Sequence, residues 1–108
     1  MSPVKITVVK RAVYDDLINR YINKERYPDG FGACALWTDG QEFVIENWPA
    51  KPHDFPCEWA WANIYPDVAT TLFGGDLWVN HPEGSYTCCQ DGLRPVVFKL
   101  ERIMECSS

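Results

Sequence analysis

SYTCCQDGLRPVVFKLERI, residues 85–103, predicts two β-strands joined by a turn. In the second strand, residues 96–103, apolar and charged side chains alternate, and this period of two is expected when one face of a strand lies on a core. Residues 90–95 separate the two strands, and their Asp-Gly pair and Pro favour a turn. We therefore expect residues 85–89 and 96–103 to pair as an antiparallel hairpin.

Two further strands are predicted upstream of this hairpin. Residues 4–9 show the same alternation, and residues 42–45 form a short run between two turns. The stretch 27–56 is otherwise interrupted by Gly and Pro, so we expect loops to dominate it. Long loops in compact domains often carry binding sites, and this one contains Cys34 and His53.

Two helices are predicted between the strands. Apolar residues recur at four-residue spacing over 13–22, which predicts an amphipathic helix that covers the sheet. A second helix is expected to begin near Cys57 and to stop at the Gly74-Gly75 pair. Pro66 falls inside it, so we expect a kink or two short helices. The residues expected on its packed face are Trp61, Tyr65, Val68 and Leu72.

Together these elements predict an α+β fold, with a small antiparallel sheet of about four strands and two helical segments packed on it. The chain has 108 residues, of which 46% are hydrophobic and 23% charged, a balance that suits one soluble domain with one core. We assign residues 1–104 to this domain and expect residues 105–108 to be a frayed tail.

Charge and hydropathy exclude several classes of partner. The net charge is −5 and the ten Lys and Arg residues form no basic block, so no nucleic-acid partner is expected. No run of 18 apolar residues exists, so no membrane partner is expected. The N-terminus also lacks the apolar segment of a signal peptide, and we expect a cytoplasmic protein. In that reducing compartment the five cysteines should be free thiols.

Three of the cysteines stand beside sequence suited to hold a thiol. Cys57 precedes the second helix, whose unpaired N–H groups and dipole would favour its thiolate. Cys88 and Cys89 are adjacent on a predicted strand and would point to opposite faces, so only one of them can belong to a given site. Cys89 borders the Asp-Gly turn and is the better candidate, and Cys34 lies in the long loop. Cys106 lies in the tail, and its substitution by Ser is expected to have no effect on function.

The sequence is compatible with two kinds of cysteine-centred site. Cys34, Cys57 and Cys89 with His53 could supply three thiolates and one imidazole to Zn or Fe, although no close Cys-x-x-Cys pair exists. Alternatively, a cofactor-free enzyme of the lyase or isomerase type would use Cys57 or Cys89 with Asp91, assisted by His53, Asp54 or Glu58. Its pocket walls would be drawn from Trp37, Trp48, Trp59, Trp61 and Trp78.

A third class of function is a non-catalytic binding module. Five Trp and five Tyr could form an adhesive face for a partner protein or for a second copy of the chain. A homo-oligomer is therefore expected whichever site is present.

Five sequence motifs can be set out along nearly the whole chain. They are Val4 to Val8; Cys34 with Gly40 and Phe43; Cys57-Glu58-Trp59-Ala60-Trp61; Gly74-Gly75; and Cys89-Gln90-Asp91-Gly92 with Pro95-Val96-Val97-Phe98. In these motifs the chain resembles an uncharacterised family of small microbial proteins. The resemblance implies a shared fold and carries no established activity. Members commonly place Pro directly after each motif Cys, where this chain has Ala35, Glu58 and Gln90.

Overall fold

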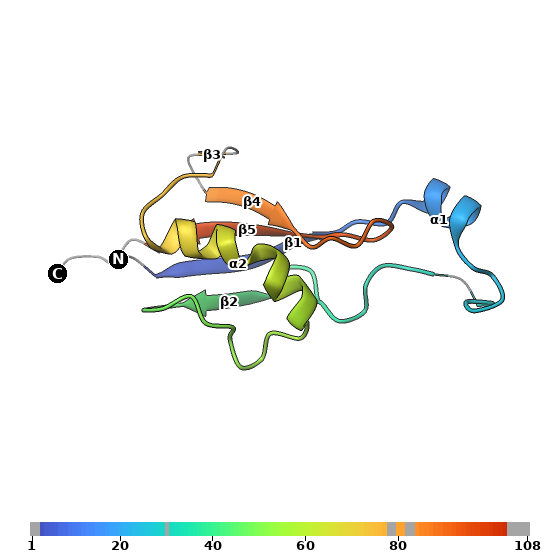
Figure 1. Ribbon diagram of the computed structural model, residues 1–108, viewed down its shortest axis with the longest axis horizontal. Coiled ribbons are helices and arrows are strands. Elements are labelled where there is room, and N and C mark those ends of the chain that lie inside the picture. The colour runs from blue at the N-terminus through green and yellow to red at the C-terminus, as the bar shows by residue number, and fades with distance from the viewer. Residues whose placement is uncertain (1–2, 30, 78–79, 82–83, 104–108) are drawn as a thin grey trace.

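A five-stranded antiparallel sheet with one helix across it forms the body of the protein (Figure 1). The computed structural model describes residues 3–29, 31–77, 80–81 and 84–103. Within them the elements are β1 (Val4–Arg11), α1 (Asp15–Tyr21), β2 (Glu42–Ile45), α2 (Glu58–Leu72), β3 (Asn80–His81), β4 (Gly84–Cys88) and β5 (Val96–Arg102). The strand order is β2-β1-β5-β4-β3, and β3 has only two residues. The predicted α+β fold, with an antiparallel sheet of about four strands and two helices, is confirmed.

The predicted hairpin is formed by β4 and β5. Ser85 pairs with Leu100 and Cys88 with Val97, so the loop between the strands spans residues 89–95. The strand β1 lies between β5 and β2 and pairs antiparallel with both. It continues two residues beyond its predicted end, to Arg11, and the register with β5 shifts between Val8 and Lys10. A bulge of this kind bends the strand and re-aims the residues that follow.

The helix α2 is one continuous helix, so the expectation of a break at Pro66 is wrong. Pro66 is exposed, which places its ring toward solvent, and the missing N–H removes one hydrogen bond without displacing a core side chain. Burial on both sides of Pro66 holds the helix together, because Ile64 and Val68 are both fully buried against the sheet. Tertiary packing, more than propensity, supplies most of the stability of such a helix.

The packed face of α2 also differs from the expected one. The helix buries Ala60, Ile64, Val68 and Leu72, a row with a spacing of four residues, together with Thr71. Trp61 is only partly buried and Tyr65 is 39% exposed. The large aromatic rings therefore flank the core row, and smaller aliphatic side chains fill the space between α2 and the sheet.

An aromatic cluster closes one end of the core and fixes the loops there. Trp37 meets Phe55 and Phe98 with ring centroids 4.9 and 5.0 Å apart, both edge to face. Phe43 of β2 contacts Phe55 at 4.9 Å. Edge-to-face pairs at these separations are favourable beyond the area that they bury. The cluster anchors the loop before β2 and the approach to α2 against the sheet.

The helix α1 does not lie over the sheet, so the expectation that it would cover the sheet is wrong. Figure 1 shows it beyond the end of the sheet, on an extension that we call the arm, residues 12–29 and 31–36. Ile18 is the one buried residue of α1. Two backbone bonds tie the root of the arm to the β4–β5 loop, from Ala12 N to Pro95 O and from Tyr14 N to Leu93 O, both 2.9 Å. The molecule is accordingly elongated, with extents of 57 × 27 × 21 Å.

Candidate functional site

A cavity of about 510 Å³ opens at the amino end of α2. Three segments distant in the sequence line it: residues 34–37 of the arm and the following loop, residues 57–63 at the start of α2, and residues 89–94 of the β4–β5 loop. A volume of this size falls within the range of about 300–1,000 Å³ that is usual for small-molecule sites. We call this cavity the pocket.

The three cysteines singled out from the sequence all line the pocket. Cys34, Cys57 and Cys89 are each partly buried, and each is a free thiol. Cys88 is exposed and is not among the lining residues. The adjacent pair is therefore separated: Cys88 ends β4, and Cys89, the first residue of the β4–β5 loop, lines the pocket.

Cys57 is the N-cap of α2. Its backbone is extended, with φ −137° and ψ 114°, and its Sγ accepts a hydrogen bond of 3.3 Å from the N–H of Ala60. Sulfur here takes the place that an oxygen of Ser or Asp usually fills at this position. The sulfur is therefore held over the first turn of α2, at the positive end of the helix dipole.

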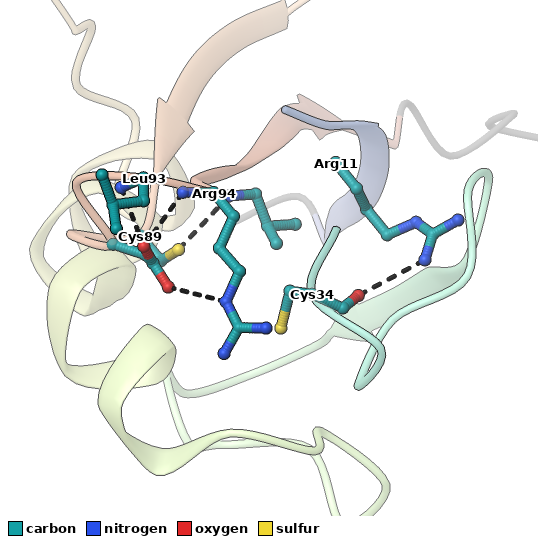
Figure 2. A network of polar contacts seen from close by, with 7 residues as sticks. Arg11, Cys34, Cys89, Leu93 and Arg94 are labelled. Atoms are coloured by element: carbon teal, nitrogen blue, oxygen red, sulfur yellow. Dashed lines mark hydrogen bonds and ion pairs between the residues drawn. The ribbon is translucent and has the colours of Figure 1, made fainter. Parts of the chain in front are cut away.

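Cys89 closes the β4–β5 loop. Its N–H donates to Val96 O at 3.1 Å, and its Sγ accepts from Val96 N at 3.3 Å. Cys34 is held through its backbone, because Arg11 Nη1 donates to the carbonyl oxygen of Cys34 at 3.3 Å. Arg11 is itself fixed by a 3.0 Å ion pair between its Nε and Asp39 Oδ1. Figure 2 shows both cysteines with their partners.

Arg94 is a charged residue of the pocket that the sequence did not identify. In Figure 2 its side chain extends from the β4–β5 loop toward Cys34. Its Nε pairs with Asp91 Oδ2 at 3.2 Å, and its guanidinium lies over the ring of Phe31 with 4.0 Å to the centroid. Among the described residues, neither Nη group of Arg94 has a hydrogen-bond acceptor. Arg94 thus presents two pre-oriented donors to the pocket.

Asp91 organises the loop that carries Arg94. Its Oδ1 accepts from the N–H groups of Leu93 and Arg94, both at 3.0 Å. Burial alone would raise the pKa of Asp91, but these two backbone bonds and the Arg94 guanidinium outweigh it and hold the pKa below 3.8. At neutral pH Asp91 is therefore ionised, and its oxygens are occupied by donors of its own loop.

Asn63 fastens α2 to the same loop. Its Oδ1 accepts from the N–H of Gln90 at 2.8 Å. Neither Asn63 nor Arg94 belongs to a motif that indicates chemistry, although an Arg three residues after an Asp in a turn is a signal for a local ion pair. The bond from Gln90 to Asn63 thus holds the β4–β5 loop against α2 at the edge of the pocket.

The predicted tryptophan walls are only partly present. Trp37 is buried and lines the pocket, and Trp59 lines it with 75% of its surface exposed, so it stands at the mouth. Trp61 packs against Phe55 and is not a lining residue, and neither is Trp48. Trp78 lies outside the described residues, as does Cys106.

The remaining predicted polar residues lie outside the pocket. His53 and Asp54 are exposed and do not line it. Glu58 is exposed and pairs with Lys51 at 2.6 Å. In the part of the chain that the structure describes, no group of three or more His, Cys, Asp or Glu residues is placed to hold a metal ion. The expected zinc or iron ligand set of Cys34, Cys57, Cys89 and His53 is therefore not seen as a group among the described residues, and His53 lies outside the pocket that the three cysteines line.

Cys88 differs from the pocket cysteines in its surroundings. Although the residue is exposed overall, partial desolvation of its thiol is the main reason that the pKa of Cys88 is raised above 9.0, with further contributions from Cys89 and Asp67. The Cys88 thiol is therefore protonated at neutral pH. Its place outside the pocket makes it an internal reference for the other cysteines.

Fold and site together define a small α+β protein with a cysteine-lined pocket. Neither helix in the described residues has the length and apolar character needed to cross a membrane. Comparisons with protein families, with curated proteins and with solved structures find no match. The resemblance to the family of small microbial proteins therefore stays a prediction, and the site is interpreted from its own geometry.

Proposed function

We propose that the pocket binds a small molecule with an apolar body and an anionic group such as a carboxylate, beside the thiols of Cys34, Cys57 and Cys89. The observation that carries the proposal is the convergence of these cysteines, which are distant in the sequence, on one cavity of about 510 Å³. Buried thiols that act only as small hydrophobes have no reason to gather at an opening with a charged residue.

The anionic group is inferred from the charges of the lining residues. Asp91 is the one carboxylate among them, and it is already paired with Arg94. The Nη donors of Arg94 and the amino end of α2 both favour negative charge. Guanidinium groups bind carboxylates through two parallel hydrogen bonds, and the stacking of Arg94 on Phe31 keeps its plane oriented for that contact.

The apolar body is inferred from the walls. Leu36, Trp37, Ala60 and Leu93 are apolar lining residues, and Trp59 stands at the mouth. Cys57 is our candidate nucleophile, because it lines the pocket and its sulfur is held at the start of α2 by the hydrogen bond from the N–H of Ala60. A catalytic function would be of the cofactor-free type, with Cys57 or Cys89 acting on the bound molecule.

Paired alkylating reagents test the proposal. Iodoacetate and iodoacetamide differ mainly in the charge of one small group, and mass spectrometry gives the labelling rate of each cysteine. We expect Arg94→Gln to lower the ratio of the iodoacetate rate to the iodoacetamide rate about fivefold at the pocket cysteine that reacts, which corresponds to about 1 kcal/mol. At Cys88 the ratio should not change.

Lys10→Gln is the matched control, because Lys10 is an exposed cation on β1 and does not line the pocket. It should leave every ratio unchanged. An equal fall at Cys88 and at the pocket cysteines in Arg94→Gln would show only a change in overall charge and would count against an anion site. Zinc or iron bound stoichiometrically to the purified protein would replace the proposal with a metal site.

A further inference from the structure

The arm is connected to the pocket near both of its ends. At its start, the N–H of Tyr14 donates to the carbonyl oxygen of Leu93 at 2.9 Å, and Leu93 lines the pocket. Toward its other end, the guanidinium carbon of Arg94 lies 4.0 Å from the centroid of the Phe31 ring, and Cys34 is itself a lining residue. The position of the arm therefore depends on residues that form the site.

The arm has little buried apolar surface to hold it in place. Within the described residues, α1 has seven residues and buries only Ile18, while Tyr14 and Tyr21 are 45% and 66% exposed. Isolated helices shorter than about 12–15 residues are marginal in water. Segments of this kind open locally at a small cost in free energy, so one or two contacts can decide whether the arm is docked.

Arg94 is shared between the arm and the proposed anion site. Its guanidinium lies over Phe31, its Nε is paired with Asp91 at 3.2 Å, and its Nη groups have no hydrogen-bond acceptor in the described part of the chain. An anion bound to the Nη groups would fix the guanidinium plane against which Phe31 packs. An undocked arm would leave that plane free to turn and would also remove Cys34 and Leu36 from the pocket wall.

We propose that the arm is coupled to the pocket through Phe31 and Arg94, so that a bound anion holds the arm docked and a docked arm strengthens binding of the anion. Phe31 is then a positioning residue for the guanidinium. Such coupling is reciprocal, because each event changes the equilibrium of the other by the same factor. The inference rests on the proposed function, since it requires an anion at Arg94.

The rates of alkylation by iodoacetate and iodoacetamide give the first test, at the pocket cysteine that reacts. Phe31→Leu should lower the ratio of the iodoacetate rate to the iodoacetamide rate about twofold to fivefold, the factor that corresponds to a cation–π contact at a partly exposed site. Arg94 itself is unchanged in this variant. A merely structural loss would expose the cysteine to both reagents alike and leave the ratio unchanged.

Two matched variants serve as controls. Phe31→Tyr keeps an aromatic ring under the guanidinium and should keep the wild-type ratio. Tyr21→Leu removes an exposed ring from another part of the arm and should also leave the ratio unchanged. A fall in the ratio for Tyr21→Leu equal to that for Phe31→Leu would overturn the assignment of the coupling to Phe31.

Hydrogen exchange of the arm, measured by mass spectrometry over residues 12–29, gives the second test. Iodoacetate leaves a carboxylate on the alkylated cysteine, whereas iodoacetamide leaves a neutral amide of similar size. We expect the backbone amides of the arm to exchange about twofold to fivefold more slowly in the carboxymethylated protein, since reciprocity requires a factor of similar size. In Arg94→Gln the two alkylated proteins should exchange alike.

The coupling and the proposed function fail in different ways. If Arg94→Gln lowers the labelling ratio but Phe31→Leu does not, the pocket binds anions and the coupling is refuted. Equal exchange of the arm in the two alkylated wild-type proteins would refute the coupling in the same way. If Arg94→Gln leaves the labelling ratio unchanged, the proposed anion site is refuted and the coupling with it.

Discussion

Asp91 is the residue that fixes the β4–β5 loop. One of its carboxylate oxygens accepts hydrogen bonds from two backbone N–H groups, and the other accepts a hydrogen bond from Nε of Arg94. The loop also carries Cys89, so Asp91 holds in place both a thiol and the cation of the pocket. Because both of its oxygens accept hydrogen bonds, Asp91 directs no unpaired oxygen into the pocket. We interpret Asp91 as a positioning residue for the site.

The lowered pKa of Asp91 makes this support dependent on pH in a defined direction. Because its folded-state pKa lies below 3.8, the ionised carboxylate stabilises the loop above that pH, and the stabilisation is lost as the pH falls through the folded-state pKa. We predict that the amide resonances of Leu93 and Arg94 shift in an NMR titration whose midpoint lies below 3.8. Asp91→Asn keeps an acceptor oxygen without a titrating charge and should abolish that transition. A midpoint above 3.8 in the wild-type chain would contradict this account.

Some residues of the candidate site could be predicted from the sequence, and others could not. Cys34, Cys57 and Cys89 could be selected because each stands at a loop, a helix start or a strand end, where a side chain is free to point into an opening. Arg94 and Asn63 could not, because their importance comes from contacts across elements: Arg94 with Phe31 of the arm, and Asn63 with the β4–β5 loop. Such contacts are set by the tertiary arrangement and leave no periodicity in the sequence.

At the scale of elements, patterns with a clear period were predictive. β2 has the predicted bounds, and the β4–β5 hairpin pairs as expected, because alternation and turn residues are local signals. The predicted face of α2 is partly wrong because the spacing of Trp61 and Tyr65 with Val68 and Leu72 also fits a helical face, whereas the buried row runs through Ala60 and Ile64. Amphipathic aromatic side chains often remain at the edge of a core with their polar groups in water.

The core row of α2 leads to a prediction about stability. Ile64 is fully buried, so Ile64→Ala should lower the free energy of unfolding by about 2–5 kcal/mol, through lost burial and the cavity left behind. Its neighbour Tyr65 is 39% exposed, and Tyr65→Ala should cost about 1 kcal/mol or less. Urea denaturation followed by circular dichroism measures both. If the tyrosine variant were the more destabilised of the two, the assignment of the core row would be wrong.

At the scale of the whole molecule, the arm gives the protein an extended shape. The Cα radius of gyration is 15.7 Å, whereas a compact chain of 100 residues has about 13 Å. The helical pattern of residues 13–22 correctly predicts a helix but cannot tell which surface covers its apolar side. A pattern that would suit packing on the sheet does not by itself specify that surface, and here the backbone bonds at the root of the arm hold α1 away from the sheet.

Small-angle X-ray scattering can decide where the arm lies in solution. The measurement is extrapolated to zero protein concentration, so that self-association does not add to the radius of gyration. We predict a value larger than the ~13 Å of a compact chain of this length, because the arm remains tied to the β4–β5 loop through Tyr14 and through the contact of Phe31 with Arg94. Since Arg94 also lies in the pocket, an arm that folded back onto the sheet would separate Phe31 from it. A radius of gyration near the compact value would therefore count against both the extended arm and the pre-oriented guanidinium.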